Sequence, residues 1–174
     1  MRFQEKDIHL SIDGLGIVFY SPETNKNIPK GCNFFEEEYA EAEDVAKHIK
    51  KGDVVGFCTG TSGDFILKFR EGYPEESICK EYPVSIRLGI DIQDDKLCVI
   101  DLYWLWEWDA EECPLEQTVS IDSGYYHITL CTRKPDSSVW GDNQIILVYL
   151  NKLDTMPEIV CSGVPLLLPP EALK

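Results

Sequence analysis

The sequence predicts a mainly β fold, an antiparallel β-sandwich that carries one peripheral α-helix. Three observations predict it: apolar and polar residues alternate along most of the chain, turn-forming residues separate these stretches, and one stretch alone has helical periodicity. A doubly wound α/β fold needs several crossover helices, and the sequence offers one. Because the chain has 174 residues, of which 44% are hydrophobic, we expect one domain over residues 1–174.

The expected helix covers residues 34–51. Acidic residues crowd its first turn and basic residues its last turn, which suits the helix dipole, and Gly52 follows as a C-cap. Apolar residues recur at a spacing of three and four and form one stripe: Phe35, Tyr39, Ala42, Ala46 and Ile49.

The period of two predicts nine strands elsewhere. They are expected at residues 9–12, 17–20, 54–58, 65–69, 84–92, 97–106, 117–121, 125–132 and 144–150. The strand 84–92 is expected to return through Asp94 and Asp95 into 97–106, as a hairpin with Trp104 in the core. The glycine-rich residues 59–64 predict a tight hairpin loop, because neither a Gly-Lys-Ser/Thr triplet nor a helix follows them.

Acidic residues outnumber basic residues by 31 to 16, which gives a formal net charge of −15. This balance argues against nucleic acids and anionic membranes as partners. Residues 97–132 contain no lysine or arginine, and their field attracts cations or a basic protein. The acids of that stretch are Asp101, Glu107, Asp109, Glu111, Glu112, Glu116 and Asp122.

Three tryptophans are candidate anchors for a partner. Tryptophan is over-represented at binding hot spots, and a ring rimmed by carboxylates receives arginine or lysine through cation–π contact. The predicted partner-binding residues are Trp106, Glu107, Trp108, Asp109, Glu111, Glu112, Glu116 and Trp140.

The sequence shows no spacing that is typical of a catalytic or metal site. Its seven cysteines include no Cys-x-x-Cys pair, which favours reduced, mostly buried thiols. The three histidines, His9, His48 and His127, lie outside any metal-binding spacing. We therefore expect no catalytic residue, no metal and no cofactor. Because no apolar stretch is long enough to span a bilayer, we expect a cytoplasmic protein.

The C-terminal half resembles a known class of proteins. Its elements are the strand hairpin, an acidic connection, the stretch VSIDSGYYHITLCT at 119–132, a Gly141-Asp142 loop and a final apolar strand. This layout over residues 84–150 is similar to that of small acidic bacterial inhibitor proteins of the competence-nuclease inhibitor type, and to immunity proteins. The resemblance implies inhibition of a secreted toxin or a nuclease.

The leading hypothesis is therefore a non-catalytic acidic protein that masks the basic surface of a toxin or nuclease. Two alternatives stay open. One is a hydrolase that acts on a carbohydrate through an acidic cleft, because paired carboxylates are plentiful around residues 107–112. The other is a carbohydrate-binding sandwich with Trp106 and Trp108 as its platform.

Overall fold

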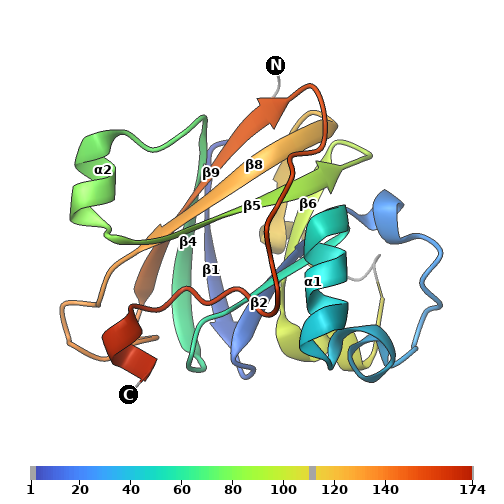
Figure 1. Ribbon diagram of the computed structural model, residues 1–174, viewed down its shortest axis with the longest axis horizontal. Helices are drawn as coiled ribbons and strands as arrows, with labels where there is room; N and C mark the ends of the chain where they lie inside the picture. Colours follow the sequence, from blue (N-terminus) through green and yellow to red (C-terminus); the bar gives the residue numbers. More distant parts are fainter. Residues whose placement is uncertain (1–2, 110–112, 174) are drawn as a thin grey trace.

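The computed structural model describes residues 3–109 and 113–173, whose strands form two sheets (Figure 1). The five-stranded sheet has the order β1-β4-β9-β8-β5, and the four-stranded sheet the order β3-β2-β6-β7. The strands are β1 (Lys6–Ile12), β2 (Gly16–Tyr20), β3 (Val54–Cys58), β4 (Gly63–Glu71), β5 (Val84–Ile92), β6 (Lys96–Asp101), β7 (Thr118–Ser120), β8 (Gly124–Thr132) and β9 (Gln144–Leu153). The prediction of a mainly β protein is confirmed.

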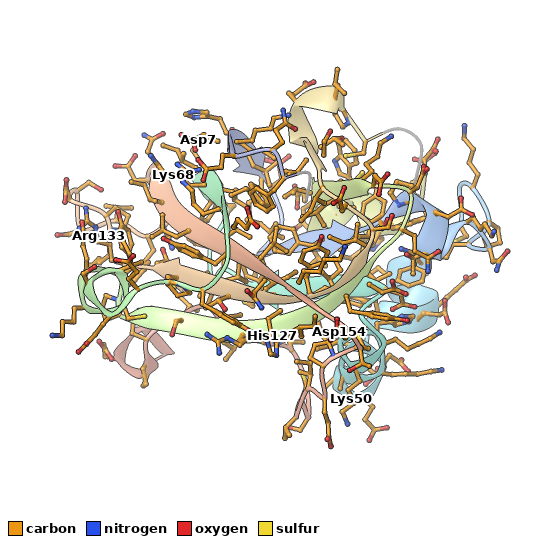
Figure 2. The ribbon with its side chains drawn as sticks, turned by 90° about the horizontal axis from the view of Figure 1, so that it is seen from above. Asp7, Lys50, Lys68, His127, Arg133 and Asp154 are labelled. Carbon is orange, nitrogen blue, oxygen red and sulfur yellow. The ribbon has the colours of Figure 1, made fainter. Side chains whose placement is uncertain are left out.

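Neighbouring strands are antiparallel with one exception. Strands β4 and β9 run parallel, so the expectation of antiparallel pairing is wrong at the centre of the larger sheet. At its edge, β1 pairs with β4 and places Asp7 opposite Lys68. Figure 2 shows these two side chains together, and their charged groups lie 3.7 Å apart.

The inner faces of the two sheets share one hydrophobic cluster. Phe19 on β2 contacts Phe57 on β3 at 5.6 Å between ring centroids, and it contacts Phe69 on β4 at 6.1 Å. Since Phe19 and Phe69 come from different sheets and are fully buried, this contact ties the sheets together.

The chain crosses between the sheets four times: from β1 to β2, from β3 to β4, from β5 to β6 and from β7 to β8. The predicted hairpin of 84–92 with 97–106 is therefore wrong, as is the hairpin at residues 59–64. Strand β5 pairs with β8, whereas β6 lies between β2 and β7. The hairpin prediction fails because β6 is a central strand. Its residues 97–100 point to both faces of the sheet and are at most 2% exposed, so both faces must be covered.

The expected helix at 34–51 is divided in two. A π-helical turn, η2 (Phe35–Tyr39), precedes helix α1 (Ala42–Lys51), and Glu41 between them has an extended backbone. Tyr39 explains the break, because its hydroxyl donates to the Val54 carbonyl and accepts from the Gly56 N–H on β3. Gly52 caps α1 in the left-handed conformation, as expected.

A second helix, α2 (Glu76–Glu81), was not predicted, because it is short and buries none of its residues. The remaining short turns are η1 (Pro22–Asn25), η3 (Leu102–Trp106), η4 (Leu115–Gln117) and η5 (Pro170–Leu173). Among the described residues, no helix has the length and apolar character needed to cross a membrane.

The expected strand 97–106 ends early, at Asp101. The Asp101 carboxylate accepts hydrogen bonds from the N–H groups of Asp13, Gly14 and Tyr103. The last of these bonds caps η3 and turns the chain out of the sheet. This acid is only 7% exposed, so it positions the chain and does not belong to the protein surface.

Candidate functional site

The candidate site is a surface formed by η2 and η3, which lie together at the α1 end of the molecule (Figure 1). Phe35 of η2 stacks on Trp106 of η3 with ring centroids 3.9 Å apart and an interplanar angle of 13°. Tyr103 meets the edge of Trp106 at 5.2 Å. Tyr103 is 51% exposed and Trp104 is 38% exposed, so aromatic rings face solvent here.

Carboxylates surround these rings. Glu36, Glu37 and Glu38 follow Phe35 within η2, and Glu107 follows Trp106. All four are exposed, and none forms an ion pair with a described residue. We call Phe35, Glu36, Glu37, Glu38, Tyr103, Trp104, Trp106 and Glu107 the acidic aromatic surface. Its charge remains available to a partner, because no lysine or arginine of the described chain neutralises it.

Trp104 and Trp108 exchange the roles that the sequence predicted. Trp104, expected in the core, is exposed because the chain leaves β6 at Asp101 and η3 turns the ring outward. Trp108, expected as a surface anchor, is 2% exposed. Its ring packs against Tyr20 and Phe34 at centroid distances of 5.0 and 5.6 Å. The predicted sugar platform of Trp106 and Trp108 is therefore wrong.

The backbone around Trp108 holds the two acidic segments together. Its N–H donates to the Cys32 carbonyl at 3.0 Å, and its own carbonyl accepts from the Gly31 N–H at 2.7 Å. Asp109, which follows, is half-buried and forms an ion pair with Lys30 at 3.0 Å. This carboxylate is thus engaged within the protein.

The other predicted partner-binding residues do not join this surface. Glu116 is exposed and lies in a separate turn, η4. Trp140 is half-buried in the loop between β8 and β9, and Figure 1 shows that loop at the end of the molecule opposite α1. Glu111 and Glu112 lie outside the described residues.

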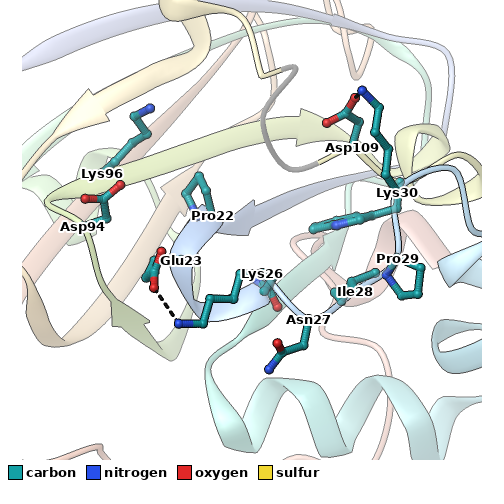
Figure 3. Close-up of a pocket in the computed structure, with 12 residues that line it drawn as sticks. Pro22, Glu23, Lys26, Asn27, Ile28, Pro29, Lys30, Asp94, Lys96 and Asp109 are labelled. Carbon is teal, nitrogen blue, oxygen red and sulfur yellow. Dashed lines mark hydrogen bonds and ion pairs between the residues drawn. The ribbon is translucent and has the colours of Figure 1, made fainter.

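Two hollows adjoin the surface. A hollow of about 220 Å³ lies between Trp104, Glu107 and Lys30. A larger one of about 690 Å³ is shown in Figure 3 and contains as many acidic as basic side chains. In this hollow Lys26 pairs with Glu23 at 2.8 Å, and Lys30 pairs with Asp109. Since these carboxylates bind lysines, the larger hollow does not resemble the paired acids of a glycosidase.

A third hollow, of about 270 Å³, brings Cys32, His48 and Asp53 to one place. The His48 Nδ1 and Asp53 Oδ1 atoms lie 2.9 Å apart. Burial raises the pKa of the Cys32 thiol, and the Glu37 and Glu38 carboxylates raise it further. An activated cysteine nucleophile needs a lowered pKa, so this group does not have the electrostatics of a cysteine hydrolase.

The described residues include no group of three or more histidine, cysteine, aspartate or glutamate side chains that could hold a metal ion.

Comparisons with known proteins add information on the fold. No protein-family model matches the chain, and a search of curated proteins finds no match. Among solved structures, the chain is similar to one described as crocagin biosynthetic gene J, at a TM-score of 0.56 and 14% identity, over 86% of this chain and 98% of that one. The two share a fold.

The chain is also similar to ComJ, the inhibitor of the DNA-degrading activity of NucA from Bacillus subtilis. The TM-score is 0.47 at 10% identity, over 88% of this chain and 100% of ComJ. The resemblance to the competence-nuclease inhibitor is thus confirmed as a weak one, and a likeness at this level carries no conclusion about function.

Sequence reasoning missed the contribution of η2. The stretch Phe34 to Tyr39 has the same composition as the η3 stretch, with aromatic residues next to acids, and that similarity was the available signal. Its acids were interpreted only as partners of a helix dipole. The Phe35–Trp106 stack that joins the two stretches depends on tertiary structure.

Proposed function

We propose that this protein is a non-catalytic binding protein that covers a basic surface of a protein partner. Within that class we propose an inhibitor or immunity role against a toxin or a nuclease, exerted in the cytoplasm by a single domain. The observation that carries the proposal is the Phe35–Trp106 stack, which joins two acidic segments around exposed aromatic rings.

The two kinds of side chain have separate roles in the proposed mechanism. Unpaired carboxylates steer a basic partner toward the surface and raise the association rate at low salt. Exposed rings such as Tyr103 and Trp104 then contact arginine or lysine side chains and slow dissociation. The hollow beside Trp104 and Glu107 offers a place for one such side chain.

The rival functions have less support. In the hollow of about 690 Å³, Glu23 and Asp109 are bound to lysines, and Asp53 is bound to His48, which disfavours an acid and base pair of a hydrolase. The carbohydrate platform loses its second ring because Trp108 is buried.

The test compares two charge-reversed variants with the same net charge. In the first, Glu36, Glu37, Glu38 and Glu107 become lysine. In the matched control, the reversed residues are Glu75, Asp136, Asp142 and Glu171, which are exposed and belong to other segments: the stretch before α2, the loop between β8 and β9, and η5. Wild type and both variants are immobilised, bacterial lysate proteins are captured at low salt, and quantitative mass spectrometry compares the three samples.

We expect wild type and the control variant to capture a basic protein, which is a nuclease or a toxin. The first variant should not capture it. With that protein purified, the first variant should lower the association rate constant at least about tenfold and weaken its salt dependence. Inhibition assays with the purified partner then test the inhibitor role. Equal binding by the first variant and the control would refute the proposal.

A further inference from the structure

The thiols of Cys98 and Cys113 lie together at the end of the β6–β7 ladder. Cys98 on β6 is paired in register with Thr118 on β7. The Cys113 Sγ atom lies 3.7 Å from the Thr118 hydroxyl, so the two cysteine side chains meet beside Thr118, and each affects the pKa of the other.

The surroundings of Cys113 stabilise its thiolate. The Cys98 thiol has the largest effect, and hydrogen bonds from Thr118, from the Val99 N–H and from the Tyr20 hydroxyl add to it. Together they outweigh burial and lower the pKa of Cys113 below the ordinary value of a thiol. The pKa of Cys98 is raised, because its proton is held in the bond to Cys113 and its side chain is buried.

The two cysteines also differ in exposure. Cys98 is 1% exposed, whereas Cys113 is only half-buried. The pair therefore combines an accessible thiolate with a protonated thiol directly behind it. This is the arrangement in which a first cysteine meets an oxidant and a second resolves the product.

We propose that Cys113 and Cys98 form an oxidant-reactive pair that closes to an intramolecular disulfide on reaction with hydrogen peroxide. The Cys113 thiolate attacks one peroxide oxygen, the O–O bond breaks, and the other oxygen leaves as hydroxide, which becomes water on protonation. The Cys98 sulfur then attacks the Cys113 sulfenic acid, its proton leaves with the hydroxyl as a second water, and the S–S bond forms. Together the two thiols lose two electrons, and one molecule of hydrogen peroxide accepts them.

The disulfide would join the segment that contains η4 covalently to β6. It would close a loop that runs from β6 through η3 and its acidic residues to Cys113. The inference is independent of the proposed function, because it uses neither the acidic aromatic surface nor a partner.

The experiment uses the full chain, reduced, freed of reductant and exposed to hydrogen peroxide at pH 7. Samples are quenched at intervals with an alkylating reagent and digested without reduction, and the peptides are measured by mass spectrometry. Cys79, which is exposed, reports in the same tube how an ordinary thiol reacts. We expect the Cys98–Cys113 disulfide as the first product, formed several-fold faster than oxidation of Cys79.

Three variants assign the roles. Cys98→Ser should leave Cys113 as a sulfenic acid that dimedone traps, and Cys113→Ser should leave Cys98 reduced. Cys131→Ser, at a cysteine that is also buried, is the matched control and should form the disulfide at the wild-type rate. The proposal fails if wild-type Cys113 reacts no faster than Cys79 or if its sulfenic acid persists unresolved, and both outcomes are measured without any variant.

Discussion

Phe35 and Trp106 stack face to face, although one lies before helix α1 and the other after strand β6. The contact links η2 to η3, and each brings its own acids. Two acidic stretches that are separate in the sequence therefore form one surface in the fold. Trp108 beneath them holds the connecting backbone in place through its bonds to Cys32 and Gly31.

Replacing Trp108 with alanine should act on stability first. The ring is buried among Tyr20 and Phe34, so its removal should lower the free energy of unfolding by about 3–5 kcal/mol. Urea denaturation measures this change. Trp104→Ala is the control, and its effect should be clearly smaller because that ring is 38% exposed. Equal losses in the two variants would contradict the burial assignment.

Removing the Tyr39 hydroxyl should destabilise the junction of η2 and α1. In Tyr39→Phe the Gly56 N–H loses its acceptor and the Val54 carbonyl loses a donor, both in a buried position. The expected cost is about 1–3 kcal/mol in the free energy of unfolding. Tyr103→Phe, at an exposed tyrosine, should change it little. If thermal unfolding is the same in both variants, Tyr39 does not hold the helix break.

Asp53 should make stability depend on pH in the acid range. Burial acts to raise the pKa of Asp53, but the hydrogen bond and charge of His48, the Val54 N–H and Lys51 outweigh it and lower the pKa. The unfolded chain, with an ordinary pKa of about 3.9, then binds the proton more readily. The contribution is present above that value and disappears as the pH falls through the lower folded-state pKa.

Asp53→Asn tests this dependence. Denaturant unfolding of wild type and variant from pH 7 to pH 2 should show a stability difference that shrinks as the pH falls below about 4. An unchanged difference over the whole range would show that the carboxylate charge does not stabilise the fold.

The period of two in the sequence located most strands to within a few residues, because an inward side chain at every second position is a local property. Strand β5 was predicted at its observed bounds. The pairing was not predictable in the same way. Asp94 and Asp95 have the positive φ angles of a tight turn, 59° and 50°, yet they lead into a different sheet.

At the candidate site, too, local composition was readable from the sequence, whereas the exposure of each ring was not. Of the predicted partner-binding residues, Trp106 and Glu107 lie on the acidic aromatic surface, and their partner-binding role stays a prediction. The exposure of Trp104 depends on the point at which β6 ends. The buried Asp101 carboxylate fixes that point through hydrogen bonds to Asp13 and Gly14, which are distant in sequence. The burial of Trp108 depends on the loop that contains Gly31 and Cys32, and the alternation of apolar and polar residues does not predict the path of a loop.

The position of β9 has a consequence for biosynthesis. Strand β9 lies at the centre of its sheet, between β4 and β8, so both neighbours keep an open edge until residues 144–153 have been synthesised and released. Until then β4 lacks its parallel neighbour, and closing that pair brings together segments that are far apart in sequence. A nascent chain stalled before residue 144 would therefore expose two unpaired strand edges. Such chains should depend on chaperones and aggregate more readily than the finished protein.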